Sequence, residues 1–570
     1  MTTYQASQSP VSTLVSSLRT DRRSVKPGPC VNAEGAPAHC RSLREQTVQV
    51  LTTGMLSDAF YAKGSELARE ASTVLTAMRD EDPMFLAQAI VYARTEGYMK
   101  LVPTLGLAIL SAGRRRETVA AFRAAFPRTV RIPDDLRNFA ELCLFDAIPG
   151  RTGLGGIARE TVREWIGEMS EYHALKYGSA ASRGVTLRDV LRLTHPRPAT
   201  AAMAERFGWL VKGAAGLGSD SGMNPQLHAF EALKRAMSED EVVALIANAR
   251  LPFEVVVPAV KATTPAIWSA LLRHAPYMNL LRSLVTYTRH GVFADEANVA
   301  LAVERLTDPR AIARSMALPF RFFDAWRRYT EMDGNDVRIA DALRVALERS
   351  FQNLPALDGG AVCIGTDVSG SMSNVISDKG STRFIDIAGI FTGALLRRIE
   401  GRVIALPFEG RVRLDGNLSA RDDVMVTAEK IAGLGGGSTA VGAPVEYLLE
   451  RKLVVNTFIG ITDNVDWAHG PEQLVSGPFL DLWRRYRREM NPKAEAFLVT
   501  IAPHRELVAP LGEPGVHFIY GWSDRVPSYI ARTLKTGESQ LDAVRAIDLG
   551  TGERNAAPPE DSSDDEPETE

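Results

Sequence analysis

Two aspartates of the sequence stand where a metal ion could be bound. Asp367 and Asp463 each directly follow a short apolar run, and a Gly-rich turn with hydroxyls, 435–439, lies between them. In parallel sheets, ligands bind outside the carboxyl ends of the strands. The spacing Asp367-x-Ser369-x-Ser371 brings three oxygens to one side of a turning loop. Carboxylate and hydroxyl oxygens suit a hard cation, so the pattern predicts a site for Mg²⁺ or another divalent cation.

Catalytic interpretations of the same region fail on spacing. A serine hydrolase elbow needs Gly-x-Ser-x-Gly, but Asp367 stands two residues before Ser369. A phosphate-binding P-loop needs Lys after its last Gly, but Gly437 is followed by Ser438. His469, shortly after the second aspartate, is interpreted as a loop residue and not as a catalytic base. We therefore expect a binding protein and no enzyme.

A second candidate for chemistry is the basic segment 176–212, which carries seven Lys and Arg against two acids. On its helical run 187–193, Arg188 and Arg192 are four residues apart and share a face. Such a face can hold phosphates, because Arg donates bidentate hydrogen bonds. From charge alone, a solvated helix is the simpler interpretation. Genomic base composition can likewise explain why 54 of the 66 basic residues are Arg.

The elements that position the basic segment are helices. From about residue 41 to 350, apolar residues recur at helical spacing, and short breaks with Gly, Pro or Asp separate the segments. The clearest segments are 83–94, 136–145, 157–169, 225–237, 239–249 and 297–306. Many short helices without a clean repeat period predict an irregular α-solenoid.

After residue 360 the pattern alternates between strands and helices, as in a mostly parallel sheet with helices on both faces. The strand-like runs are 361–366, 403–406, 456–462, 496–501 and 516–520. The helical runs between and after them are 384–400, 441–450, 479–490 and 528–534. The two aspartates follow the first and third of these strands.

Composition excludes several classes of protein. The 570 residues are 45% hydrophobic and 24% charged, which is ordinary for a globular protein. No apolar core of a secretory signal follows Met1, and the longest apolar run, 101–113, is too short to span a membrane. Four cysteines make no disulfide framework, and Cys30 with Cys40 would be only half a zinc site. We expect a cytoplasmic protein.

The net charge of −3 hides a gradient. Residues 1–360 sum to +6, residues 361–554 to −2, and the last sixteen residues carry seven acids and no base. Residues 1–40 are rich in Ser, Pro, Gly and Ala, which predicts a flexible arm. The acidic residues 554–570 are expected to be a solvated, disordered tail.

The segment after residue 360 resembles von Willebrand factor A domains over about 190 residues, on its Asp-x-Ser-x-Ser motif and the two later loops. The resemblance implies a metal-ion-dependent adhesion site that binds an acidic group of a partner. It assigns as metal ligands Asp367, Ser369, Ser371, Thr439 and Asp463. Ser438 is an alternative to Thr439 for the hydroxyl of the second loop.

The helical half resembles the TROVE domain of Ro ribonucleoproteins, on 174–177 (ALKY) and 184–198 (GVTLRDVLRLTHPRP). Three upstream segments, 81–90, 131–135 and 153–156, and the order of the two domains are similar to that family. The resemblance implies a ring of HEAT-like repeats closed by the A domain, with a positively charged central hole. By the same resemblance, Lys176 and His195 match a Lys and a His with which the family binds RNA. The family also uses an Arg near them, and Arg183 is the candidate for that residue.

These inferences define four segments: an arm 1–40, a TROVE domain 41–355, an A domain 356–553 and a tail 554–570. The resemblance implies a monomeric ring that binds Y-like noncoding RNA outside and single-stranded 3′ ends of misfolded RNA inside. It also implies RNA quality control with polynucleotide phosphorylase as a partner. The RNA-binding residues expected are Lys176, Arg183, Arg188, Arg192, His195 and Arg197. The alternative is a protein-interaction scaffold whose A domain binds an acidic partner.

Overall fold

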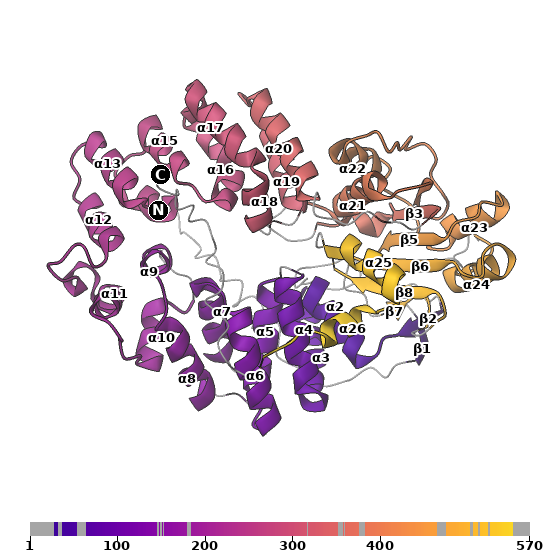
Figure 1. The fold of residues 1–570 in the computed structure, drawn as a ribbon, viewed down its shortest axis with the longest axis horizontal. Coiled ribbons are helices and arrows are strands. Elements are labelled where there is room, and N and C mark those ends of the chain that lie inside the picture. The colour runs from indigo at the N-terminus through magenta and orange to yellow at the C-terminus, as the bar shows by residue number, and fades with distance from the viewer. Residues whose placement is uncertain are drawn as a thin grey trace, which may run out of the picture.

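The computed structural model shows a curved array of helices followed by an α/β domain (Figure 1). The structure describes residues 28–31, 37–53, 64–97, 99–144, 148, 151, 153–178, 184–315, 317, 319–351, 357, 360–375, 382–463, 475–501, 506–510, 513–521 and 525–550. The predicted fold class, a helical repeat array with a C-terminal α/β domain, is confirmed.

The helical array runs from α2 to α20. Its helices are α2 (Leu43–Thr53), α3 (Gly64–Glu81), α4 (Pro83–Thr95), α5 (Leu101–Ser111), α6 (Arg116–Thr129), α7 (Pro133–Leu144), α8 (Gly155–Ile166), α9 (Glu171–Gly178), α10 (Leu187–Thr194), α11 (Ala201–Lys212), α12 (Pro225–Leu233), α13 (Glu239–Ala249), α14 (Phe253–Ala259), α15 (Pro265–Arg273), α16 (Tyr277–Arg289), α17 (Glu296–Thr307), α18 (Pro309–Ser315), α19 (Pro319–Thr330) and α20 (Val337–Ser350). Short 3₁₀ turns, η1 (Gly213–Gly216) and η2 (Val292–Ala294), interrupt it. Within the described residues, none of these helices has the length and apolarity needed to cross a bilayer.

Capping residues in the sequence explain where several helices begin. The Asp82 side chain accepts a hydrogen bond from the amide of Phe85 at the start of α4. Ser238 and Thr264 do the same for α13 and α15. Each cap satisfies an amide that has no partner within its helix. Caps of this kind therefore define where these short helices begin.

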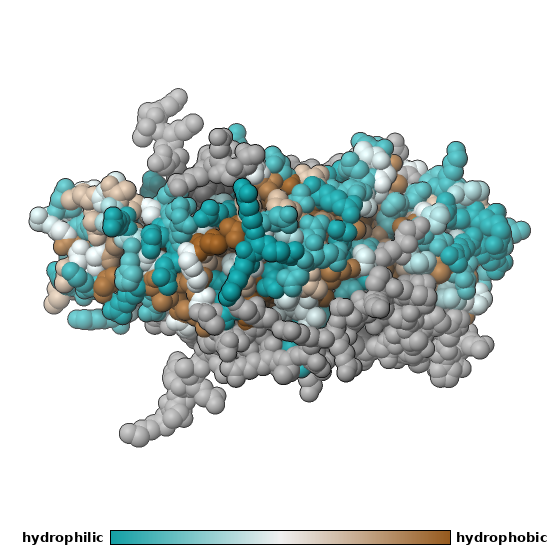
Figure 2. All heavy atoms as spheres, turned by 90° about the horizontal axis from the view of Figure 1, so that it is seen from below, coloured by the Kyte–Doolittle hydropathy of each residue, from teal (hydrophilic) through white to brown (hydrophobic). Residues whose placement is uncertain are grey.

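The helices stack in two layers. Helices α4, α6, α8 and α10 contact one another in that order, and Figure 1 shows α6 and α8 on the outer side of the curve. Helices α5, α7 and α9 contact one another in the same way and lie on the inner side. This layering is that of an α-solenoid, in which each pair packs on its neighbours. Figure 2 looks from below at the outer layer, where hydrophilic side chains predominate.

The C-terminal domain has a parallel sheet of five strands in the order β4-β3-β5-β6-β8. The strands are β3 (Val362–Asp367), β4 (Val403–Phe408), β5 (Thr457–Thr462), β6 (Glu495–Thr500) and β8 (Val516–Tyr520). Its helices are α21 (Phe384–Arg398), α22 (Val424–Ala432), α23 (Ala443–Glu450), α24 (Phe479–Glu489), α25 (Arg525–Thr536) and α26 (Gln540–Arg545), and a 3₁₀ turn, η3 (Gly370–Ser373), follows β3. Both faces of the sheet are covered, because Ile364 and its neighbour Cys363 belong to different apolar clusters.

Two junctions close the helical array and the α/β domain into a ring. At the first, Asp386 near the start of α21 is fully buried and accepts hydrogen bonds from the guanidinium groups of Arg327 on α19 (3.2 Å) and Arg383 (2.8 Å). The Thr382 hydroxyl also donates to Asp324 of α19 (3.3 Å). A charge buried in this way is stable only while its partners remain in place.

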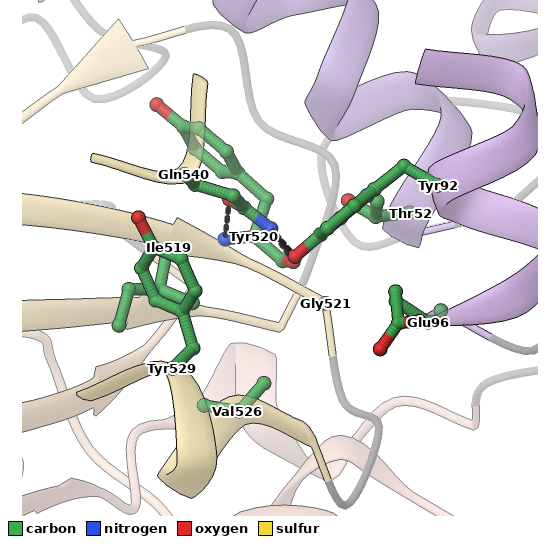
Figure 3. Close-up of a pocket in the computed structure, with 10 residues that line it drawn as sticks. Thr52, Tyr92, Glu96, Ile519, Tyr520, Gly521, Val526, Tyr529 and Gln540 are labelled. Atoms are coloured by element: carbon green, nitrogen blue, oxygen red, sulfur yellow. Dashed lines mark hydrogen bonds between the residues drawn. The ribbon is translucent and has the colours of Figure 1, made fainter. Parts of the chain in front are cut away.

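At the second junction, α26 packs on α4, and Gln540 connects the two domains (Figure 3). Its side-chain oxygen accepts from the amide of Tyr520 (2.9 Å), while its Nε2 donates to the carbonyl of Tyr520 (3.1 Å) and to the Tyr92 hydroxyl (3.3 Å). A small pocket lies beside these groups, lined also by Glu96 and Tyr529. The ring is therefore closed by polar contacts at both ends of the α/β domain.

The structure corrects the prediction of a flexible arm over residues 1–40. β1 (Gly28–Val31) and β2 (Pro37–Cys40) form an antiparallel hairpin, and β2 pairs with β7 (Glu506–Leu507) of the α/β domain. The prediction is wrong for these two segments, and the rest of 1–40 lies outside the described residues. The acidic tail also lies outside them.

Candidate metal centre and nucleic-acid interface

The two aspartates predicted to bind metal lie at the same edge of the sheet. Asp367 ends β3, and Asp463 follows β5 directly. The two strands are parallel neighbours in which Thr366 pairs with Ile461, so both acids stand at the carboxyl ends. Asp367 is 0% exposed and Asp463 is 2% exposed. The fold therefore holds two carboxylates close together and away from water.

Hydrogen bonds orient the loop that carries the first three predicted ligands. The amide of Ser369 donates to Asp367 Oδ1 (2.9 Å), and the Thr462 hydroxyl donates to Asp367 Oδ2 (2.7 Å). The hydroxyls of Ser369 and Ser371 are 3.2 Å apart and hydrogen-bonded to each other. Both serines are buried, so their oxygens line the rim beside Asp367.

The Gly-rich loop is held against this rim by backbone hydrogen bonds. The amide of Gly370 donates to the carbonyl of Gly437 (3.1 Å), and the amide of Gly436 donates to the carbonyl of Val368 (2.9 Å). Gly437 has φ +81°, a left-handed conformation that favours glycine, and a Cβ there would also displace the carboxylate of Glu409. The same loop carries Thr439, which is buried.

The electrostatics of the rim fit a cation. Burial and the nearby Asp463 carboxylate both raise the pKa of Asp367, although hydrogen bonds from Ser369 and Thr462 oppose the rise. Two buried carboxylates repel each other, and a bound cation offsets both the repulsion and the lost hydration. The side chains predicted as ligands at this rim offer oxygen atoms from two carboxylates and three hydroxyls. The rim therefore fits Mg²⁺ better than a softer metal.

Glu409 is an acid of this edge that sequence reasoning missed. It directly follows β4, lies against Gly437, and has a carboxylate oxygen 3.5 Å from Arg413. An acid directly after an apolar run is the signal that identified the two aspartates, and the same signal is present at Glu409.

The predicted basic helix α10 begins with a capping box. The Thr186 hydroxyl accepts from the amide of Asp189 (3.0 Å), and the Asp189 carboxylate accepts from the amide of Thr186 (3.0 Å). These bonds fix the start of the helix. Arg188 and Arg192 are exposed on it, and Arg188 Nε donates to the carbonyl of Leu210 on α11 (3.2 Å).

The end of α10 displays three of the predicted RNA-binding residues. His195 caps the helix in the left-handed conformation, with φ 48°, and its amide donates to the carbonyl of Leu191 (2.8 Å). Arg192, His195 and Arg197 are all exposed there. Sequence reasoning missed Arg163 of α8, whose Nε donates to the carbonyl of Thr194 (2.8 Å) and adds a cation to the same surface.

Lys176 lies in a different environment, on the inner-layer helix α9. Its Nζ is 3.2 Å from a carboxylate oxygen of Glu254 on α14 and donates to the Tyr172 hydroxyl (3.3 Å). Burial lowers the pKa of Lys176, but Tyr172 and Glu254 outweigh burial and hold the pKa above its ordinary value. The residue is therefore a half-buried, ion-paired cation. Arg183 lies outside the described residues.

Comparisons with known proteins agree with this architecture. Residues 256–333 match the TROVE domain family model, and residues 361–533 match the Ro60 vWA domain model. The chain is 26% identical over 471 residues to the RNA-binding protein RO60 of Deinococcus radiodurans, an alignment that covers 79% of this chain and 85% of that protein.

A solved structure has a similar fold. The crystal structure of the Deinococcus radiodurans RO (RSR) protein superposes with a TM-score of 0.64 and 22% identity, covering 87% of this chain and 100% of that one. At this identity the similarity establishes the fold alone. The resemblance to TROVE proteins with a von Willebrand A domain, inferred from the sequence, is confirmed.

Proposed function

Because the chain carries a TROVE domain followed by a Ro60-type von Willebrand A domain, we propose that it is an RNA-binding ring protein. In this proposal the outer layer binds a structured, Y-like noncoding RNA. The centre of the ring takes single-stranded 3′ ends of misfolded RNA. The protein acts in RNA quality control, as a cytoplasmic monomer without catalysis of its own, and passes RNA to polynucleotide phosphorylase.

The observation that carries the proposal is the exposed cationic surface where α10 ends. Arg192 and Arg197 project from the outer layer, and Arg163 holds the helix end beside them. Exposed guanidinium groups bind phosphates with paired hydrogen bonds and release counterions from RNA. A similar protein of Deinococcus radiodurans is named an RNA-binding protein. Together these support RNA as the ligand of this surface.

Lys176 contributes in a second way. It is ion-paired with Glu254, so it contacts a phosphate only by exchanging the carboxylate for it. Tyr172 and Tyr177 flank its ammonium group, with ring centroids 5.5 and 5.7 Å away. Aromatic rings beside a cation can stack unpaired bases. This arrangement supports recognition of an RNA segment with accessible bases.

We propose that the rim of the A domain binds Mg²⁺ through Asp367, Ser369, Ser371, Thr439 and Asp463. A bound Mg²⁺ would supply an electrophilic position for a carboxylate or phosphate of a partner. The orientation of the Asp367 carboxylate comes from the protein itself, through hydrogen bonds from the Ser369 amide and the Thr462 hydroxyl. Metal binding would therefore need little rearrangement of this loop.

The test compares two charge-matched double variants. Arg192→Ser with Arg197→Ser removes two cations from the α10 surface, and Arg421→Ser with Arg451→Ser removes two exposed cations from the A domain. The probe is a labelled RNA stem-loop with a single-stranded 3′ extension, titrated at several salt concentrations. We expect the α10 pair to weaken binding and to reduce the slope of log K against log salt by about one to two.

The A-domain pair should leave both quantities unchanged. Equal affinity and equal salt slope for the α10 pair and the wild type would contradict the proposed RNA surface.

A second candidate function, a metal-dependent scaffold for an acidic protein partner, is favoured by the buried rim itself. In that case RNA binding is incidental. Protein purified without nucleic acid, judged by the 260/280 absorbance ratio at low salt, would favour the scaffold. Co-purified nucleic acid that is lost at high salt would favour the RNA function.

A further inference from the structure

The C-terminal end of the described chain is fastened to the outer layer of the helical array. Figure 1 shows the segment after α26 running along the array towards α6. Gln88 Nε2 on α4 donates to the carbonyls of Arg545 (2.8 Å) and Ile547 (3.1 Å). The Arg128 guanidinium of α6 donates to the carbonyl of Asp548. The residues that follow therefore leave from a fixed point at the C-terminal end of α6.

The residues that follow include the acidic tail 554–570, whose last sixteen residues carry seven acids and no base. Two helices further along the outer layer lies a surface of opposite charge. We name it the outer basic face, formed by Arg159, Arg163, Arg188, Arg192 and Arg197, all of them exposed. Three acids lie on α8 and α10, and one of them, Glu160, pairs with Arg123 of α6 (2.7 Å). Five arginines against Glu164 and Asp189 leave the face with a net positive charge.

The tail is long enough to reach this face. Helix α6 contacts α8, and α8 contacts α10, so two interhelical spacings of about 8–10 Å separate α6 from α10. Glu553 stands beside Arg554, and ten residues separate Gly550 from Glu560, the first of the seven acids of the tail. A relaxed chain of that length spans about 16–19 Å, and a fully extended one about 33–36 Å. The first acids therefore reach α10 without stretching the chain.

We propose that the acidic tail binds the outer basic face of its own chain and competes there with RNA phosphates. Carboxylates and phosphates accept the same paired hydrogen bonds from arginine. Attachment at Asp548 gives the tail an effective concentration of the order of millimolar. A contact with a dissociation constant of about 0.1 mM then keeps the face about nine-tenths occupied, and an RNA displaces the tail only when it makes more phosphate contacts. The competition with RNA rests on the proposed function, whereas the tail contact does not.

The test keeps the full chain and changes only the tail. In the neutral-tail variant all seven acids become Asn or Gln, and in the scrambled-tail control the order of residues 555–570 changes while the charge stays. We expect the neutral-tail protein to bind the RNA stem-loop about tenfold more tightly at low salt, because a competitor present at about ten times its dissociation constant weakens RNA binding by about that factor. The gain should vanish at high salt, and the scrambled tail should behave as wild type.

The same gain should be absent when Arg192→Ser and Arg197→Ser are also present, because the face is then lost. Equal RNA affinity of wild-type and neutral-tail proteins at low salt, or a gain that survives the arginine changes, would overturn the competition.

A second arm needs no RNA. A fluorescent peptide of residues 551–570 is titrated into the neutral-tail protein, and its anisotropy is measured at low salt. Binding that weakens with the two arginine changes, but not with Arg421→Ser and Arg451→Ser, supports the contact. No binding at millimolar protein would overturn the contact. If the peptide binds and the RNA does not, the proposed RNA function fails while the tail contact stands.

Discussion

The two buried carboxylates of the A-domain rim predict a metal dependence of stability with a definite sign. Asp367→Asn keeps the shape of the side chain, so its oxygen can still accept from the amide of Ser369. It removes one of two negative charges that repel each other out of water. We therefore expect the variant to be at least as stable as wild type in EDTA, and to gain no stability from Mg²⁺.

The magnitude follows from mass action. At a Mg²⁺ concentration of about 100 times Kd, wild type should gain about 2.7 kcal/mol. For a domain of about 150–250 residues, 1 kcal/mol shifts Tm by about 2–4 °C. The transition of the A domain should therefore rise by about 5–11 °C in wild type and not at all in Asp367→Asn.

The assay is calorimetric unfolding of the full chain in EDTA and in Mg²⁺. Asp415→Asn is the matched control, because Asp415 is an exposed acid of the same domain that binds Arg413. It should keep the full Mg²⁺ shift. The reasoning would be refuted if Mg²⁺ did not change the Tm of wild type, or if Mg²⁺ raised the Tm of Asp367→Asn as much as that of wild type.

Three further predictions concern the ring junction and the RNA surface. Asp386→Ala removes a buried carboxylate that two guanidinium groups contact, so we expect the free energy of unfolding to fall by about 3 kcal/mol. The loss should appear as a large fall in Tm. Arg338→Ala, at an exposed arginine, is the control and should leave Tm unchanged. His195→Gly relieves a left-handed φ that costs about 1 kcal/mol, so Tm should hold or rise while RNA affinity falls in a gel shift. Glu254→Gln frees the Lys176 ammonium from its ion pair, so RNA affinity in the gel shift should rise. Unchanged affinity would mean that Lys176 makes no phosphate contact and that the pair serves only the fold.

Local patterns were sufficient to predict much of the fold. The runs 239–249 and 516–520 match α13 and β8 residue for residue, because their apolar spacing and flanking signals are local. Helix α22 went unpredicted, since β-branched residues are frequent among its nine residues and disfavour helices in sequence reasoning. The hairpin of β1 and β2 lies in a Pro- and Gly-rich segment, where its pairing with β7, more than 450 residues away, leaves no local signal.

In the candidate sites too, features with a local signal could be predicted from sequence, and tertiary contacts could not. Asp367 and Asp463 are found from sequence because each ends a strand, and parallel strands bring their ends to one edge. The ion pair of Lys176 with Glu254 joins helices 78 residues apart, and nothing in the sequence near either residue indicates it. Burial and pairing depend on tertiary contacts, so the sequence predicted an RNA-binding lysine but not its ion pair.

The most direct test of the account is a map of where RNA touches the full chain. A stem-loop RNA carrying 4-thiouridine is crosslinked to the protein with ultraviolet light, and the modified peptides are identified by mass spectrometry. We predict crosslinks within residues 155–200, on α8, α10 and the end of α10, that are lost with Arg192→Ser and Arg197→Ser. Crosslinks confined to the A domain, or unchanged by these two substitutions, would contradict the account.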